Sequence, residues 1–148
     1  MRDGDESAAA MRRLLTGRRY GVLATAGPNG PHASLVAFAA HDDLARIIFP
    51  TPRDTLKYSN LKSEPRAALL VDDRANSADD LERATALTIR GAARELTGRE
   101  RREAAEVFLA RHRSLKSFVD SPECALFTIE IASAGLAEGF SGTEGRPS

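Results

Sequence analysis

Apolar and polar positions alternate along most of the chain in short runs that predict β-strands. Strands are expected at residues 20–25, 31–40, 45–49, 66–72, 84–96 and 124–136. The turn sequence Gly27-Pro28-Asn29-Gly30 joins the first two strands into a hairpin. In the fifth strand Gly91 indicates a bulge or a close approach of another backbone.

Three segments instead show the spacing of amphipathic helices. A short helix is expected at residues 7–15, a second at residues 52–62 and a third after Thr97, where Glu100 follows at the spacing of a capping box. Strands and helices do not alternate strictly. The pattern therefore predicts a mainly β domain, an antiparallel barrel of about six strands with helices covering its openings.

The start of the second helix is the most informative stretch. It predicts Thr51 as N-cap, Pro52 at the first helical position and Asp54 at the third. Two hydroxyls, of Thr51 and Thr55, and two cations, Arg53 and Lys57, then stand beside the free N–H groups of the first helical turn. This combination suits a phosphate group, although an ordinary capped surface helix has the same features.

Composition narrows the function classes. The 148 residues, 42% of them hydrophobic, fit one domain spanning residues 1–148, with flexible ends expected at residues 1–6 and 138–148. The 21 basic residues balance 21 acidic ones, and aromatic residues make up 5%, which argues against nucleic acid and anionic membranes as partners.

The chain shows no apolar run long enough to span a membrane and no apolar core segment within its first ten residues, so we expect a cytoplasmic protein. Its single cysteine, Cys124, begins an apolar strand and is interpreted as a buried, inert thiol. We predict no metal site, because the adjacent aspartates of the polar loops are typical of solvated surface residues.

Five motifs in order resemble the pyridoxamine 5′-phosphate oxidase-like family, the FMN-binding split barrels. They cover roughly residues 10–132 and are Pro-His-Ala-Ser-Leu-Val-Ala-Phe (31–38), Ile-Ile-Phe-Pro-Thr (47–51), Thr-x-Lys-x-x-Asn-Leu (55–61), Glu-Pro-Arg-Ala-Ala-Leu-Leu-Val (64–71) and Ile-Arg-Gly-Ala-Ala-Arg-Glu-Leu (89–96). The resemblance implies a six-stranded, Greek-key split β-barrel flanked by helices. It also implies a homodimer with two FMN sites at the subunit interface and a small-molecule substrate.

The resemblance also implies which residues bind the cofactor. The FMN phosphate would lie at the end of the third strand and the start of the following helix. The isoalloxazine ring would lie along the backbone of the second strand. The residues at the matching positions are Thr51, Arg53, Thr55 and Lys57 for the phosphate, and Ser34, Leu35 and Val36 for the ring; Phe49 is also expected among the cofactor-binding residues.

The chain departs from the family pattern at its C-terminus. Members that oxidise pyridoxamine phosphate carry an Arg-x-His pattern there, and a haem-degrading branch carries a histidine iron ligand. Here the tail after Leu136 holds no histidine. We therefore expect no pyridoxamine phosphate oxidase activity and interpret His32, His41 and His112 as structural residues.

No motif marks a nucleophile or a strong general base, so the catalytic residues stay unassigned. This suits a flavoprotein, in which the cofactor supplies the redox chemistry. The leading hypothesis is an FMN-dependent oxidoreductase. A haem-binding or non-catalytic flavin-binding protein and a deazaflavin (F420)-dependent reductase remain alternatives.

Overall fold

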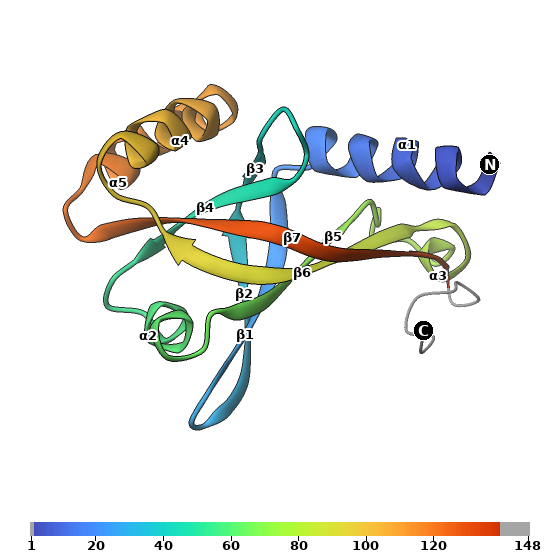
Figure 1. Cartoon of the computed structure of the whole chain (residues 1–148). Coiled ribbons are helices and arrows are strands. Elements are labelled where there is room, and N and C mark those ends of the chain that lie inside the picture. The colour runs from blue at the N-terminus through green and yellow to red at the C-terminus, as the bar shows by residue number, and fades with distance from the viewer. Residues whose placement is uncertain (1, 140–148) are drawn as a thin grey trace.

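The computed structural model describes residues 2–139, with side chains from Gly4 onward. Seven strands and five α-helices follow one another along this part of the chain (Figure 1). Their bounds are α1 Arg2–Gly17, β1 Tyr20–Gly27, β2 Gly30–Ala37, β3 Ala39–Ala40, β4 Arg46–Pro52, α2 Leu56–Ser63, β5 Arg66–Asp72, α3 Asp80–Arg83, β6 Thr85–Glu95, α4 Gly98–Arg111, a 3-10 turn Arg113–Leu115, α5 Lys116–Asp120 and β7 Cys124–Glu138.

The strands form one curled antiparallel sheet in the order β2-β1-β5-β6-β7-β4-β3. The two edge strands, β2 and β3, are consecutive in the chain and are separated by a single residue, Phe38. The chain itself therefore joins the edges of the sheet, and β2 lies against β4 without pairing with it. This is the arrangement of a split barrel, and the predicted mainly β, helix-flanked fold is confirmed.

The predicted count of six strands was wrong by one, because the strand expected at residues 31–40 breaks at Phe38. The Phe38 side chain is fully buried, its N–H donates to the Arg19 carbonyl at 3.1 Å, and its carbonyl contacts His112 Nε2 at 2.8 Å. Both backbone groups of Phe38 are thus bonded outside the sheet. The residues on either side pair with different strands, Ala37 with Tyr20 and Ala39 with Ile48.

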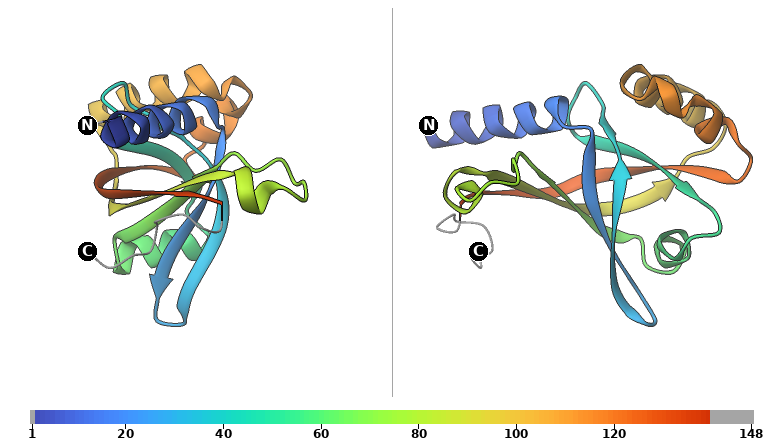
Figure 2. Two further views of the ribbon diagram at one scale, coloured as in Figure 1. Left: turned by 90° about the vertical axis from the view of Figure 1, so that its right-hand side faces the viewer. Right: turned by 180° about the vertical axis from the view of Figure 1, so that it is seen from behind.

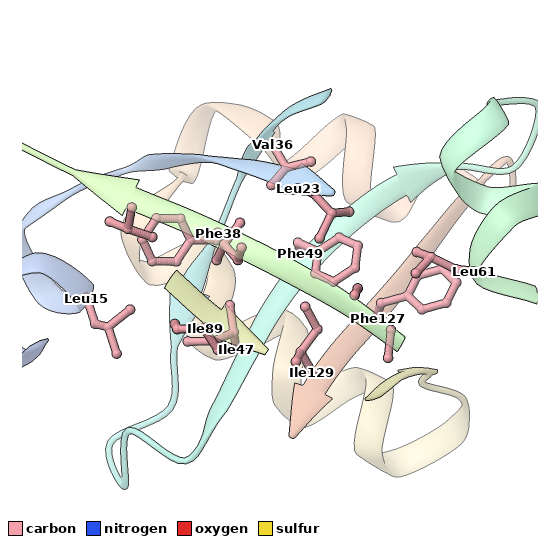
Figure 3. Close-up of a cluster of buried hydrophobic side chains, with 14 of the residues drawn as sticks. Leu15, Leu23, Val36, Phe38, Ile47, Phe49, Leu61, Ile89, Phe127 and Ile129 are labelled. Atoms are coloured by element: carbon pink, nitrogen blue, oxygen red, sulfur yellow. The ribbon is translucent and has the colours of Figure 1, made fainter. Parts of the chain in front are cut away.

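The barrel interior is packed with aliphatic and aromatic side chains (Figure 3). Phe49 and Phe127 stack with ring centroids 5.6 Å apart, and Leu61 of α2 joins them. A smaller cluster, which includes Ile48, Phe108 and Val119, fills the space between the sheet and the helices α4 and α5. The two clusters cover opposite faces of β4, which explains why its central residues are all buried.

The bulge predicted at Gly91 is confirmed. The pairing of β6 with β7 shifts register between Arg90 and Gly91. A Cβ atom at position 91 would lie 2.0 Å from the Glu130 carbonyl oxygen, so the close backbone approach leaves no room for a side chain.

The helices differ from the predictions mainly at their ends. The first begins at Arg2 rather than Ser7, so residues 2–6, expected to be flexible, are helical. Of the C-terminal segment expected to be flexible, residue 138 belongs to β7 and residues 140–148 lie outside the described residues. Among the described helices, none combines the length and apolarity needed to cross a membrane.

His112 connects the helices to the barrel. It forms the C-cap of α4, is 5% exposed and lies against Phe108 and Tyr20. A cation at a helix C-terminus is usually favourable. Here burial lowers the pKa of His112, and the nearby charges of Arg111 and Arg19 lower it further, against the hydrogen bond to Phe38. The fold therefore favours the neutral imidazole.

This gives the first prediction. In the unfolded chain this histidine is protonated below its ordinary pKa near 6.5, whereas in the folded chain it is protonated only at lower pH. The contribution of neutral His112 to the free energy of unfolding is therefore fully present above pH 6.5 and is lost as the pH falls. His112→Gln keeps an N–H donor but cannot titrate. The difference in unfolding free energy between wild type and variant, from urea unfolding, should narrow between about pH 7 and pH 5. A constant or widening difference would contradict this account.

Candidate cofactor site

The structure corrects the predicted start of the second helix. α2 begins at Leu56, and its N-cap is Thr55 rather than Thr51. The Thr55 hydroxyl accepts a hydrogen bond from the Tyr58 N–H at 3.3 Å and donates one to the Pro52 carbonyl at 2.7 Å. Asp54, expected inside the helix, precedes it.

Thr51 and Pro52 instead continue β4. Along residues 46–52 this strand pairs with β7, whereas β3 covers only Ile47 and Ile48. Beyond Ile48 one side of β4 is therefore an edge, where prolines are tolerated because their missing N–H has no strand to face. Pro50 and Pro52 extend the strand for this reason, although their sequence is also typical of a helix start.

Arg53 is held in a local network. Its Nη1 group donates to Glu95 Oε2 at 2.6 Å and to the Tyr58 hydroxyl at 3.2 Å, and its Nε group donates to the Pro122 carbonyl at 3.2 Å. The hydrogen bond to Glu95 raises the pKa of Arg53. Of the two predicted cations, Arg53 therefore already has an anionic partner.

Lys57 differs from Arg53 in this respect. It lies in the first turn of α2 and makes no hydrogen bond or ion pair with any described residue. Burial lowers the pKa of its ammonium group. An unpaired and partly buried ammonium group is a favourable partner for an incoming anion.

Two of the predicted hydroxyls are also without a partner among the described residues. Ser34 Oγ and Thr51 Oγ1 are both buried and accept or donate no hydrogen bond. Ser34 lies on β2 with Val36, and Thr51 lies on β4 with Phe49; Val36 and Phe49 both belong to the interior cluster. Since β2 and β4 lie against each other without pairing, the two hydroxyls lie on the interior faces of the two strands that flank the split of the barrel.

The remaining predicted residues differ in exposure. Leu35 is 71% exposed, whereas Val36 and Phe49 are buried in the core. β2 is an edge strand, so one row of its N–H and C=O groups has no strand to pair with. Residues 34–36 can therefore offer backbone groups to a ligand, whichever way their side chains point.

Sequence reasoning missed three residues of this region. Tyr58 and Glu95 form the network around Arg53, and Asn60 fixes α2 to β1 by donating from Nδ2 to Thr25 Oγ1 at 3.1 Å. Glu95 ends β6, and no local signal in the sequence indicates that this strand end meets the start of α2.

The other candidate residues serve the fold. Burial raises the pKa of the Cys124 thiol, although nearby cations oppose this. Among the described residues, no three side chains of the metal-ligating types His, Cys, Asp and Glu gather into a potential metal site.

The groups available to a ligand are the unpaired Lys57 ammonium, the unpaired hydroxyls of Ser34 and Thr51, the free N–H groups at the start of α2 and the open edge of β2. They suit a ligand that combines an anionic end with a flat hydrogen-bonding body.

Comparison with known proteins agrees with this fold. The pyridoxamine 5′-phosphate oxidase family model matches residues 7–135. Since the match covers most of the chain, the protein belongs to this family.

Solved structures of the same fold have different described ligands. A haem-binding protein from Mycobacterium smegmatis is 20% identical with a TM-score of 0.81; the match covers 91% of this chain and 55% of that one, so this chain spans about half of that relative. An FAD-binding protein from Mesorhizobium loti is 18% identical with a TM-score of 0.71, covering 87% and 90%. HutZ, the haem storage protein from Vibrio cholerae, is 16% identical with a TM-score of 0.75, covering 88% and 92%. No curated protein sequence matches the chain.

The corrected cap generates the second prediction. Thr55→Ala removes both hydrogen bonds of the N-cap hydroxyl and should lower the free energy of unfolding by about 1 kcal/mol. Thr97→Ala is the matched control, because Thr97 caps α4 without a side-chain hydrogen bond and its loss should have little effect. Chemical denaturation of both variants measures the difference. Equal losses would contradict the assignment of Thr55 as the functional cap.

Proposed function

We propose that the protein is an FMN-binding oxidoreductase whose cofactor lies at the split of the barrel. The observation that carries the proposal is the unpaired Lys57 ammonium beside the free N–H groups at the start of α2, together with the unpaired Thr51 hydroxyl at the end of β4. Membership of the family supports the choice of a flavin phosphate as the anion.

The residues divide into two groups by the part of the cofactor that they would hold. Lys57, Thr51 and the N–H groups of Leu56 and Lys57 would bind the phosphate. Backbone groups of Ser34, Leu35 and Val36 on the open edge of β2, with the Ser34 hydroxyl, would bind the ring. Arg53 and Thr55 already donate hydrogen bonds to Glu95 and to the Pro52 carbonyl. They would therefore shape the phosphate site and would not be its main anion ligands.

The protein's contribution is position and charge. When bound, the flavin would accept a hydride from a reduced nicotinamide or a similar donor and pass the electrons to a small-molecule acceptor. The positive end of α2 and the Lys57 charge would stabilise the phosphate dianion in a partly dehydrated site. Pyridoxamine 5′-phosphate is not the proposed substrate. The expectation that this substrate is not oxidised rests on the missing Arg-x-His pattern in the tail after Leu136, most of which lies outside the described residues.

Haem binding is the second candidate, favoured by the descriptions of two structural relatives. Of the three histidines, His112 is buried and bonded to the Phe38 carbonyl, which leaves it poorly suited as an iron ligand. A deazaflavin cofactor would need the same phosphate site. The visible absorption spectrum of the purified protein distinguishes bound flavin from bound haem.

We also propose a homodimer that buries the outer face of the hairpin. On this face the central positions of β1, β2 and β5 present apolar residues, flanked on β5 by Arg66 and Asp72, and none of these apolar residues is fully buried. We call this set the apolar outer face; it consists of Tyr20, Val22, Ala24, Ala26, Pro31, Ala33, Leu35, Ala37, Ala68 and Leu70. No helix crosses β1 and β2 in the view from behind (Figure 2). A contiguous apolar surface of this kind is typical of an interface.

The phosphate site gives the third prediction. Lys57→Ala combined with Arg53→Ala should weaken FMN binding at least tenfold, since the charge-assisted hydrogen bond of Lys57 to the phosphate alone contributes roughly 1.5–3 kcal/mol. Quenching of FMN fluorescence measures the dissociation constant, and circular dichroism verifies the fold. Unchanged affinity in a folded double variant would place the phosphate elsewhere.

The outer face gives the fourth prediction. Sedimentation equilibrium at micromolar concentration should give about twice the chain mass of 15.9 kDa. Leu35→Glu introduces a charge on the apolar outer face and should shift the equilibrium to monomer. Leu81→Glu is the control, because Leu81 is 54% exposed on α3 outside this face. A wild-type monomer that still binds flavin would rule out the interface.

A further inference from the structure

The Glu95 carboxylate accepts hydrogen bonds from three side chains of the segment at the proposed phosphate site. Arg53 Nη1 lies 2.6 Å from Oε2, and the Tyr58 hydroxyl and Lys62 Nζ lie 3.1 and 3.3 Å from Oε1. The Glu95 side chain is 14% exposed. Although burial opposes ionisation, these three donors lower the pKa of Glu95, so it is a carboxylate at neutral pH.

Tyr58 holds the two cations in this arrangement. The guanidinium of Arg53 and the ammonium of Lys62 each lie 5.7 Å from the centroid of its ring. The ring edge packs against Phe127 in the core. The network is therefore anchored to the barrel. While Glu95 is charged, it holds the Arg53 and Lys62 side chains in their present orientation.

The charges around the start of α2 are consequently divided. Arg53, Lys57 and Lys62 supply three cations, and Glu95 pairs with Arg53 and Lys62. Lys57 has no ion-pair partner among the described residues, and neither does the neighbouring Asp54. Of the three cations of this segment, Lys57 is therefore the one that no described carboxylate engages in an ion pair.

We propose that Glu95 is a positioning residue, which retains Arg53 in an ion pair and thereby limits how strongly the site binds a phosphate dianion. The inference rests on the proposed function, because it assumes that the start of α2 is the phosphate site. Arg53 stands two residues before the N-cap, and its side chain is 37% exposed. Without the Glu95 charge, Arg53 keeps its hydrogen bonds to Tyr58 and the Pro122 carbonyl but loses its ion pair, so its charge becomes available to an anion bound at the helix start.

Glu95→Gln tests this inference directly. The amide keeps the size of the side chain and an acceptor for Tyr58 but removes the charge. We expect FMN and inorganic phosphate to bind about three- to tenfold more tightly at low ionic strength, with the gain shrinking in high salt because the added attraction is electrostatic. FMN affinity is measured by fluorescence quenching, and phosphate affinity by the rise in melting temperature with phosphate concentration.

Two further variants separate the release of Arg53 from a general change in charge. Adding Arg53→Ala to Glu95→Gln should cancel the gain and return the affinity to within about twofold of wild type. Glu100→Gln is the matched control. It removes a carboxylate that pairs with Arg94, the residue beside Glu95 in β6, but on the side that faces α4, so it should leave the affinity unchanged.

The outcomes distinguish this inference from the proposed function. Weaker or unchanged binding in Glu95→Gln, or a gain that survives the loss of Arg53, would overturn the role of Glu95. If Glu95→Gln does not fold, Glu95→Asp, which withdraws the carboxylate by one methylene, should show a smaller gain in affinity for FMN and phosphate. Unchanged affinity in folded Glu95→Asp would then overturn the role of Glu95. If phosphate binds and responds to Glu95→Gln but FMN does not bind, the proposed function fails and the role of Glu95 stands. If neither ligand binds to any variant, both fail.

Discussion

The fold depends on how Phe38 is bonded at the point where β2 becomes β3. Both of its backbone groups are satisfied by partners outside the sheet, Arg19 and His112, and its side chain is fully buried. The chain can therefore pass from one edge strand of the sheet to the other at Phe38 without leaving the buried N–H or carbonyl of this residue unpaired. Because Ala37 and Ala39 then pair with strands on different sides, the sheet curls until β2 lies against β4.

The proposed site follows from this incomplete closure. β2 and β4 are in contact but share no ladder of backbone hydrogen bonds, so one row of β2 backbone groups has no strand partner. The hydroxyls of Ser34 and Thr51 also have no hydrogen-bond partner among the described residues. β4 then delivers the chain to α2, whose first turn adds free N–H groups and Lys57. A buried unpaired hydroxyl is unfavourable in a finished core, whereas it is suited to a site that a polar ligand completes.

The sequence predicted features that depend on local patterns. The alternation of apolar and polar residues predicted the strands, and Gly91 predicted the bulge in β6. The ordered motifs indicated the family, which the family match confirms. The break at Phe38 could not be predicted, because it depends on a histidine 74 residues further along the chain. The helix cap was placed at Thr51 instead of Thr55, since the proline pattern fits a helix start and, equally, a strand edge exposed by the short β3. The pairing of Arg53 with Glu95, 42 residues apart, likewise has no local signal.

We propose that the start of α2 recognises the phosphate of a flavin. Titration of the cofactor-free protein with FMN and with riboflavin, which lacks the phosphate, measures what the phosphate contributes to binding. FMN is expected to bind at least about tenfold more tightly, because Lys57 and the helix N–H groups act on the phosphate alone. Equal affinities for the two flavins would contradict it.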